Sequence, residues 1–335
     1  MTPTTRALTR AVERLSGPTI VVVGDLIADE YLFGKPARIS REAPVLILRF
    51  TEREVLLGGA ANAAHNVHAL GARVIPIGVV GADAAGDEVL ALFHRVGITT
   101  DGIVREAGRQ TPVKTRIMAG GYQATRQQVV RLDREPLEEP LSSTGDALIA
   151  RVTALAARAD AVLISDYGYG TITNGVLESV RALARKSRAI VTVDSRYDLL
   201  RFTGVTAATP NEAELAQLTG DVVDDERALE KAGRRVLECL GCRILLVTRG
   251  SQGMAVLERD GETSFIPIHG TDEIADVTGA GDTVISTFTT ALASGATPFE
   301  AASLANVAGG VVVMKRGTAT VSAAELRQAL GETGP

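Results

Sequence analysis

The sequence predicts an α/β fold with a mostly parallel central sheet, helices on both of its faces and a small β-sheet lid. Two observations predict the sheet: short apolar runs alternate with amphipathic stretches, and the runs are continuously apolar. Continuous apolar strands are typical of a parallel sheet, because helices bury both strand faces. A third observation predicts the lid, since residues 30–57 and 102–134 carry short alternating strands where helices would otherwise follow.

The apolar runs give the expected strands of the central sheet in chain order. They are TIVVVGD at 19–25, RVIPIGVVG at 73–81, AVLISD at 161–166, AIVTVD at 189–194, TAATP at 206–210 and CRILLVTRG at 242–250. Polar residues stand at the ends of several runs: Asp25, Asp166, Asp194 and Thr248, with Asn211 just after its strand. Because the carboxyl ends of parallel strands meet at one edge, we expect a ligand crevice there.

The two segments with alternating strands are expected to pair into one sheet. Such a sheet, inserted twice from points near the crevice, forms a lid over the substrate and a surface for a homodimer. Two unrelated surface hairpins are the alternative, although long excursions inside an α/β domain are more often functional than idle. Residues 1–335 are therefore expected to form a single domain, with lid segments at about 30–57 and 102–134.

Charge and composition narrow the class of partner. The net charge of −5 gives no basic excess for nucleic acid or anionic lipid, so small solutes are the expected ligands. The first residues lack an apolar stretch, and no window approaches the ~20 apolar residues that span a bilayer, so we expect a cytoplasmic protein.

Cys239 and Cys242 form a C-x-x-C pair, a spacing that a redox dithiol or half of a zinc site would use. Because the sequence has no second pair, we expect reduced structural thiols.

One stretch, DVTGAGD at 276–282, carries the strongest chemical signal. If a helix begins near residue 279, the backbone N–H groups of Gly279, Ala280 and Gly281 form a positive concavity for a phosphoryl group. Asp282 follows in the first turn. Taken alone, it is equally explained as an acid that stabilises the start of a helix.

The wider set of motifs resembles a known family over nearly the whole chain. DVTGAGD occurs in fixed order with GDLIAD at 24–29, GGAANAAHNVHALGA at 58–72, TPNEAEL at 209–215, TRGSQG at 248–253 and NVAGGVVVMKRGTATVS at 306–322. This set resembles the ribokinase-like (PfkB) carbohydrate kinases. Within that family, the segments around GDLIAD, GGAAN and GTATVS look most like the heptose-phosphate kinases, the kinase half of a bifunctional enzyme of ADP-heptose synthesis for lipopolysaccharide.

The resemblance implies a ribokinase-like fold and transfer of the γ-phosphoryl group of ATP to a sugar hydroxyl. The expected acceptor is C1 of D-glycero-D-manno-heptose 7-phosphate, with ribose, fructose or a related sugar as the alternative. Asp282 is implied as the general base, and Gly279, Ala280 and Gly281 as the anion hole. Sugar contacts are implied for Asp25, Gly58, Gly59 and Asn62, although GGAAN is also explained as a tight turn into a helix.

The implied nucleotide side has three parts. Asn211 and Glu214 match an N-x-x-E element that organises water-coordinated Mg²⁺, although NEAEL is also a good capping start for a helix. Nucleotide contacts are implied for Thr248, Gly250, Gly253 and Asn306, although TRGSQG is also explained as a plain hairpin turn. A monovalent cation such as K⁺ is implied near Asp276, Thr278 and Gly317.

Five cationic residues in the lid segments are candidates for binding the substrate phosphate. The alternative is that they are ordinary solvent-exposed residues of the lid surface. They are Arg38, Arg41, Lys114, Arg116 and Arg126. Two positions depart from the heptose-kinase pattern and bear on the choice of sugar: Glu30 stands where a basic residue is expected, and Ser195-Arg196 stands in place of Pro-Lys.

Two other classes of protein fit less well. A silent sugar- or nucleotide-binding regulator would be expected to lack the base or the glycine turn, yet both are present. A dinucleotide-dependent oxidoreductase would carry G-x-G-x-x-G after its first strand, where GDLIAD stands.

Overall fold

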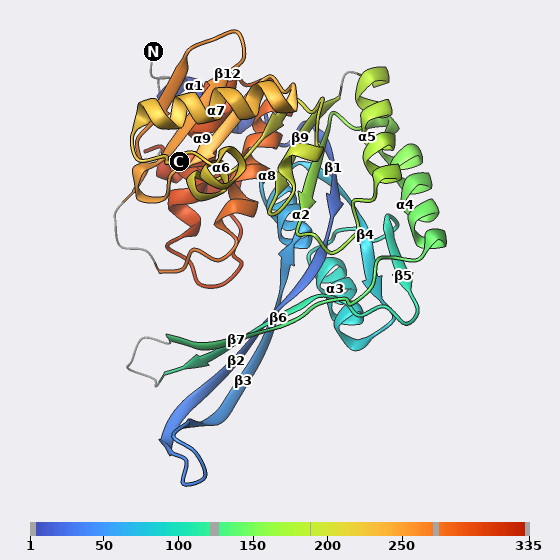
Figure 1. Cartoon of the computed structure of the whole chain (residues 1–335), viewed down its shortest axis with the longest axis vertical. Coiled ribbons are helices and arrows are strands. Elements are labelled where there is room, and N and C mark those ends of the chain that lie inside the picture. Colours follow the sequence, from blue (N-terminus) through green and yellow to red (C-terminus); the bar gives the residue numbers. More distant parts are fainter. Residues whose placement is uncertain (1–4, 121–126, 188, 271–274, 332–335) are drawn as a thin grey trace.

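The computed structural model describes residues 5–120, 127–187, 189–270 and 275–331. A body made of one large sheet with helices on both faces carries a long ribbon of strands that projects from it (Figure 1). Within these ranges no helix combines the length and the apolar character needed to cross a membrane.

The central sheet has nine strands in the order β13-β12-β11-β10-β9-β8-β1-β4-β5. They are β1 (Thr19–Gly24), β4 (Arg73–Gly81), β5 (Ile103–Glu106), β8 (Ala161–Asp166), β9 (Ile190–Ser195), β10 (Ala207–Ala208), β11 (Ile244–Thr248), β12 (Met254–Glu258) and β13 (Thr263–Ile266). All pairings are parallel except β11 with β12 and β12 with β13. The expected α/β fold with a mostly parallel sheet is confirmed, and each apolar run named above forms one of its strands.

Strand β1 explains why these runs are continuously apolar. Val21 and Val23 pack into one hydrophobic cluster and Ile20 and Val22 into another, and all four are fully buried. Each fully buried aliphatic side chain contributes roughly 1.5–3 kcal/mol relative to an exposed one. The two clusters lie on opposite faces because successive side chains of a strand point in opposite directions.

Helices cover both faces. The helices whose buried residues join the cluster of Val21 and Val23 are α4 (Ser142–Leu155), α5 (Asn174–Ser187), α6 (Glu212–Thr219) and α7 (Glu226–Leu240). Those on the other face are α1 (Thr5–Glu13), α2 (Ala60–Ala69), α3 (Ala84–Arg95), α8 (Ala280–Ala293), α9 (Pro298–Val312) and α10 (Ala323–Ala329). Short 3₁₀ turns lie at Ala156–Arg158, Leu199–Arg201 and Gly250–Gln252.

The projecting ribbon is the expected lid, a four-stranded sheet in the order β3-β2-β6-β7. Its strands are β2 (Leu26–Ile39), β3 (Leu46–Gly59), β6 (Val113–Ala119) and β7 (Gln127–Arg134). Strand β2 pairs in parallel with β6, so the two lid segments do join into one sheet. The second segment differs from its expected bounds, because β5 lies at the edge of the central sheet beside β4.

A network of charged side chains ties the base of the lid to the body. The Arg53 guanidinium of β3 donates to both carboxylate oxygens of Glu88 in α3, at 2.6 and 2.8 Å, and to Glu30 of β2 at 2.6 Å. Thr115 of β6 donates to the other oxygen of Glu30 at 2.6 Å. Glu30, the departure from the heptose-kinase pattern, thus belongs to the attachment of the lid.

The two cysteines are not joined to each other. Cys239 is exposed at the end of α7 and Cys242 is buried. Burial raises the pKa of the Cys242 thiol to about 11, which makes it unreactive at neutral pH.

Candidate active site

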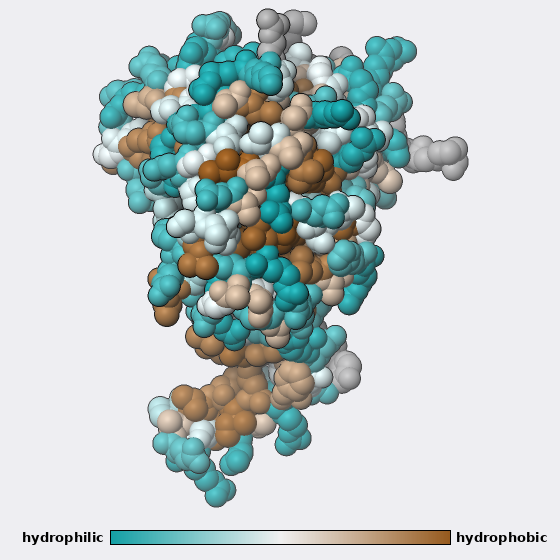
Figure 2. All heavy atoms as spheres, turned by 90° about the vertical axis from the view of Figure 1, so that its right-hand side faces the viewer, coloured by the Kyte–Doolittle hydropathy of each residue, from teal (hydrophilic) through white to brown (hydrophobic). Residues whose placement is uncertain are grey.

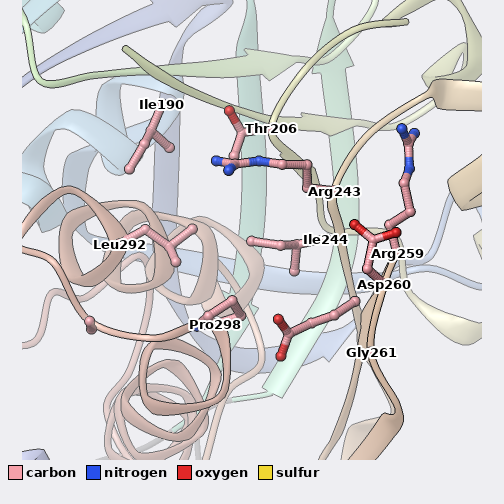
Figure 3. Close-up of a pocket in the computed structure, with 11 residues that line it drawn as sticks. Ile190, Thr206, Arg243, Ile244, Arg259, Asp260, Gly261, Leu292 and Pro298 are labelled. Atoms are coloured by element: carbon pink, nitrogen blue, oxygen red, sulfur yellow. The ribbon is translucent and has the colours of Figure 1, made fainter. Parts of the chain in front are cut away.

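A cavity of about 440 Å³ opens where β8, β9 and β11 end and α8 begins. It is lined by Asp166, Tyr167, Asp194, Arg196, Thr209, Asn211, Glu214, Thr248, Val277, Gly279, Gly281, Asp282 and Val284. A second cavity, of about 360 Å³, lies where β9 and β11 start, and none of the expected site residues line it (Figure 3). The predicted crevice at the carboxyl ends of the strands therefore exists.

Asp282 lies in the first turn of α8 with only 3% of its surface exposed. The Asn62 amide donates to Asp282 Oδ2 at 2.9 Å, and the Tyr167 hydroxyl donates to Oδ1 at 2.9 Å. Burial raises the pKa of the Asp282 carboxyl to about 6, against the lowering effect of these two hydrogen bonds. A carboxylate with this pKa is ionised at neutral pH and still basic enough to take a proton.

The orientation of Asn62 is fixed by the packing of α2 on α8. Asn66 donates to Asn62 Oδ1 at 3.1 Å, so the NH₂ group of Asn62 faces Asp282. Thr283 donates to Asn66 Oδ1 at 3.0 Å, and Ser286 donates to the Ala63 carbonyl at 3.0 Å. The alanines of α2 let the two helices come close enough for these buried polar contacts.

Gly279 and Gly281, in the turn before Asp282, are glycines for different structural reasons. Gly279 has φ 77°, and a Cβ there would lie 2.6 Å from Asn62 Nδ2, the atom that holds Asp282. A Cβ at Gly281 would meet no atom within 4 Å, and Gly281 lines the cavity. Among the described residues the Gly281 N–H has no hydrogen-bond partner, so this donor is available at the positive end of α8.

Besides Asp282, three acidic side chains and one cation, Arg196, line the cavity within the described part of the chain. Burial and the nearby carboxylates of Glu214 and Asp282 raise the pKa of Asp194 to about 8, and burial raises the pKa of Glu214. Burial and the charge of Asp25 raise the pKa of Asp166, to which the Ser195 hydroxyl donates at 2.8 Å. These shifts mean that the cavity favours a positive charge among its carboxylates.

The carboxylates are not arranged as a direct metal cage. Within the ranges that the structure describes, no three His, Cys, Asp or Glu side chains are grouped closely enough to hold a metal ion. Hard cations such as Mg²⁺ accept water and phosphate oxygens as most of their ligands, so a wall of carboxylates behind coordinated water fits such an ion.

Asn211 and Glu214 form the capping box of α6. Asn211 Oδ1 accepts from the Glu214 N–H at 2.8 Å, and Glu214 Oε2 accepts from the Asn211 N–H at 2.9 Å. Both residues also line the cavity, where a β-bridge pairs Asn211 with Thr248 at the end of β11. Helix capping therefore accounts for one side-chain oxygen of each residue and leaves a second polar atom on each.

The other residues expected at the nucleotide do not line this cavity. Gly250 and Gly253 lie in the turn that joins the antiparallel strands β11 and β12, so TRGSQG does form a hairpin turn. A Cβ at Gly253 would lie 2.1 Å from the Ile266 carbonyl oxygen, which requires a glycine there. Asn306 of α9 donates to the neighbouring Pro267 carbonyl at 2.7 Å.

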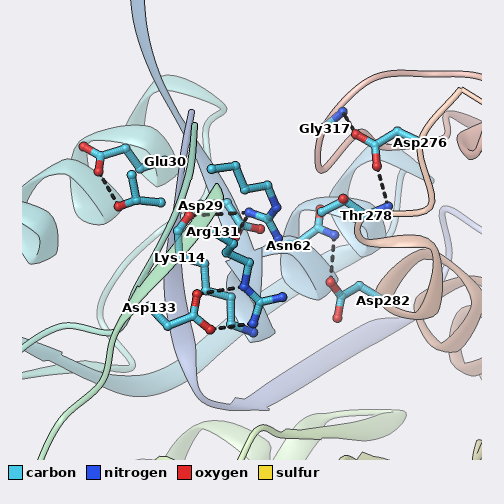
Figure 4. A network of polar contacts seen from close by, with 12 residues as sticks. Asp29, Glu30, Asn62, Lys114, Arg131, Asp133, Asp276, Thr278, Asp282 and Gly317 are labelled. Atoms are coloured by element: carbon cyan, nitrogen blue, oxygen red, sulfur yellow. Dashed lines mark hydrogen bonds and ion pairs between the residues drawn. The ribbon is translucent and has the colours of Figure 1, made fainter. Parts of the chain in front are cut away.

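Asp276 joins the two loops expected to hold a monovalent cation. Its carboxylate accepts from the Thr278 N–H at 2.9 Å and from the Gly317 N–H at 3.0 Å (Figure 4). Although burial opposes the effect, these hydrogen bonds hold the pKa of Asp276 below its ordinary value. An ionised, partly buried carboxylate that bridges two loops fits a monovalent cation.

The expected sugar contacts lie at the junction of body and lid. Asp25 is 1% exposed and accepts three backbone N–H groups, those of Tyr167 at 2.8 Å, Tyr169 at 3.1 Å and Thr171 at 3.2 Å. Gly58 and Gly59 end β3, where a Cβ would collide with the Asp29 carboxylate or the Asp25 carbonyl, respectively. None of these three residues lines the cavity.

The lid cations separate into two groups. Lys114 and Arg116 are buried at the base of the lid, whereas Arg38 and Arg41 are exposed towards its tip. Arg126 lies outside the described residues. Arg116 pairs with Asp29 at 2.7 Å, and the Lys114 ammonium lies 4.5 Å above the centre of the Tyr167 ring (Figure 4 shows Lys114 beside Asp29).

The structure gives Asp282 two direct neighbours that the sequence does not place there. Asn62 is among the expected site residues, but as a sugar contact, and Tyr167, which follows the strand-end residue Asp166, is not among them. The position of Tyr167 directly after a strand of the sheet was the available signal.

The fold and the cavity are those of a small-molecule phosphotransferase: an α/β body, a β-sheet lid, and an acid at a helix N-terminus beside an acidic cavity. The chain belongs to the pfkB family of carbohydrate kinases, whose family model matches residues 18–325. It is therefore a carbohydrate kinase.

Curated relatives match nearly the whole chain. The bifunctional protein HldE of Mesorhizobium japonicum is 42% identical over 330 residues, which cover 98% of this chain and 65% of the relative. HldE of Geobacter sulfurreducens is 41% identical over 312 residues, 93% of this chain and 62% of the relative. The chain thus spans slightly less than two thirds of the length of these relatives.

Solved structures share the fold at low sequence identity. Arabidopsis thaliana ribokinase, complexed with ribose and ATP, superposes with a TM-score of 0.72 at 22% identity, covering 94% of this chain and 99% of that chain. Phosphofructokinase-2 from Escherichia coli, in complex with potassium, gives a TM-score of 0.75 at 17% identity, covering 93% and 97%. These likenesses confirm the ribokinase-like fold.

Proposed function

We propose that this carbohydrate kinase transfers the γ-phosphoryl group of ATP to the C1 hydroxyl of D-glycero-D-manno-heptose 7-phosphate, a step towards ADP-heptose. The observation that carries the chemistry is the buried Asp282 carboxylate at the N-terminus of α8, held by two hydrogen-bond donors at the wall of the cavity. The choice of sugar rests on the motifs shared with heptose-phosphate kinases, and the relatives named HldE agree with it.

Asp282 acts as the general base. As the sugar oxygen attacks the γ-phosphorus, the new O–P bond forms while the bond between the γ-phosphorus and the bridging oxygen of ADP breaks. The hydroxyl proton passes to an oxygen of Asp282, which returns it to solvent after the product leaves. The raised pKa of about 6 suits this role, because proton transfer is most effective near the working pH.

The turn of Gly279, Ala280 and Gly281 stabilises the transferred group. The free Gly281 N–H and the positive end of α8 point at charge that develops on the phosphoryl oxygens. The open space around the Gly281 Cα supports this assignment, because a phosphoryl oxygen must come within about 3 Å of the donor nitrogen.

The acidic wall explains why ATP would bind with a divalent cation. The raised pKa values of Asp194 and Glu214 mean that, among the described residues, these carboxylates lack a cationic partner that outweighs their burial. Mg²⁺ held through water near Asn211 and Glu214 would supply that charge and would neutralise the β- and γ-phosphates. Thr248, Gly250, Gly253 and Asn306 are assigned to the nucleotide on the same side of the cavity. K⁺ is assigned to the loops bridged by Asp276, including Thr278 and Gly317.

On the sugar side, Asp25, Gly58, Gly59 and Asn62 form the wall between the base and the lid. Lys114 is the first candidate for the 7-phosphate, because its buried ammonium has no ion-pair partner within the described part of the chain. Arg116 is already paired with Asp29 and is the second candidate. Arg38 and Arg41 lie too near the exposed tip to take part within one protomer.

A substrate panel tests the proposal. With ATP and Mg²⁺ saturating, kcat/KM for the heptose 7-phosphate should exceed that for the bare heptose, ribose, fructose and fructose 6-phosphate. A charge-assisted pair is worth ~1.5–3 kcal/mol, or roughly 10–150-fold, so Lys114→Met should remove an advantage of this size. Arg38→Met is the control. A bare pentose or hexose as the best substrate would contradict the heptose assignment and leave the sugar-kinase assignment standing.

The lid also supports a homodimer. Large apolar side chains are exposed on β2, β3 and β7 and on the β2–β3 connection, and Figure 2 shows apolar side chains gathered on the projecting ribbon. They are Ile39, Val45, Leu46, Phe50, Val129, Val130 and Leu132. Such a patch favours burial against a second copy. Sedimentation should give a dimer that Phe50→Glu dissociates, and a monomeric wild-type protein would contradict this assembly.

A further inference from the structure

The loop after β8, residues 167–171, is held from two sides. The Asp25 carboxylate accepts from three of its backbone N–H groups. From the other side the buried Arg109 guanidinium donates to the Tyr169 carbonyl at 2.5 Å and to the Glu138 carbonyl at 2.9 Å. A loop with this many charge-assisted bonds has a defined shape.

The conformation of this loop places the Tyr167 side chain against the Asp282 carboxylate. The Tyr167 hydroxyl donates to Asp282 Oδ1 at 2.9 Å, opposite the Asn62 amide on Oδ2. The Lys114 ammonium packs on the Tyr167 ring from the lid, at 4.5 Å from its centre. Tyr167 thus links the lid, the body and the carboxylate.

We propose that Tyr167 is a positioning residue for phosphoryl transfer, which orients the Asp282 carboxylate so that its remaining lone pairs face the sugar hydroxyl. Asp25 contributes to the reaction through Tyr167, by fixing the loop that carries it. The inference rests on the proposed function of Asp282 as the general base.

The charges around Asp282 and Tyr167 determine in which direction the pKa of Asp282 changes when the Tyr167 hydroxyl is removed. Burial and the negative charge of Asp282 raise the pKa of Tyr167 well above its ordinary value, so its hydroxyl stays a donor at every assay pH. The other charged groups that act on Asp282 are Asp29 of β2 and Lys114 of β6, and Asp194 of β9 interacts with it across the cavity. Removing the Tyr167 hydroxyl takes away a bond to the ionised carboxylate and therefore raises the pKa of Asp282.

Tyr167→Phe tests this inference, because it keeps the ring beneath Lys114 and removes only the hydroxyl. We expect kcat to fall about tenfold, the scale of one hydrogen bond to a charged group, with KM for ATP unchanged. The acid limb of the kcat–pH profile should move to higher pH. Tyr169→Phe is the matched control: its hydroxyl donates to Glu135 at 2.9 Å, outside the cavity, so the acid limb should stay in place.

A double-mutant cycle separates positioning from general structural damage. In an Asp282→Asn background, Tyr167→Phe should cause no further loss of the residual rate, because its partner is already altered. A further tenfold loss there, an unmoved acid limb in Tyr167→Phe, or an equal shift in Tyr169→Phe would each overturn the inference. If Asp282→Asn itself keeps normal turnover, the proposed base fails, and that result is distinct from these three.

Discussion

Gly281→Ala should make the protein more stable and less active at once. The added methyl group would meet no protein atom within 4 Å, and residue 281 has helical backbone in the first turn of α8. An unstrained glycine-to-alanine change in a helix stabilises by roughly 0.4–1 kcal/mol. For a chain of 335 residues that corresponds to a Tm higher by roughly 0.5–1.5 °C.

The same methyl group would occupy the space assigned to the phosphoryl group. Loss of one preorganised donor to a developing oxyanion typically costs about 10²–10³-fold in kcat, and we expect a loss of that order. ADP release in a coupled assay and a thermal melt without ligand give the two quantities on the same preparation.

Gly145→Ala is the matched control for Gly281→Ala. Gly145 also lies in the first turn of a helix, α4, and a Cβ there would likewise meet no atom within 4 Å. This variant should gain stability and keep its kcat. If Gly281→Ala retains wild-type kcat, the space around Gly281 does not receive the phosphoryl group and the anion-hole assignment is refuted.

Three further variants probe the cavity wall and the turn. Glu214→Gln keeps a side chain that can cap α6 but loses the charge, so the Mg²⁺ concentration for half-maximal activity should rise, and an unchanged Mg²⁺ titration would count against the assignment. Asp194 has a folded-state pKa of about 8, above its unfolded value of about 3.9, so its burial destabilises the metal-free protein increasingly as pH rises through this interval. Asp194→Asn should therefore raise Tm at pH 8 more than at pH 5 in EDTA, whereas an equal shift at both pH values would disprove the burial argument. Gly279→Ala should destabilise by about 1–3 kcal/mol and lower kcat, since it combines a φ of 77° with a collision at Asn62 Nδ2, and a stable, active variant would show that the turn can relax.

The central sheet could be predicted because a strand that is buried on both faces is apolar at every position, which is easily recognised in the sequence. Runs such as Ile20–Val23 are apolar at every position, and the structure buries each of them completely. The short strand β5 has no continuous apolar run, because its four residues include Arg105 and Glu106. Strands β12 and β13 are not among the expected strands, because the turn at 248–253 that precedes them is expected at the nucleotide, with a plain hairpin turn only as the alternative.

The cavity was predictable to the extent that strand ends determine it. Asp166, Asp194, Asn211 and Thr248 converge because their strands end at one edge of the sheet. The contact between Asn62 and Asp282 was not predictable, since it joins residues 220 positions apart through the packing of two helices. Local sequence patterns determine neither the register of α2 against α8 nor the path of a loop such as 167–171.

The turnover of Asp282→Asn tests the central claim most directly. The substitution preserves the shape of the side chain and removes its capacity to accept the hydroxyl proton. The assay measures transfer of the γ-phosphoryl group of ATP to the heptose 7-phosphate, with binding of ATP and Mg²⁺ checked separately. We predict a loss in kcat of about 10²–10⁴-fold with ATP binding retained. A folded Asp282→Asn protein that turns over at close to the wild-type rate would contradict the assignment of Asp282 as the base.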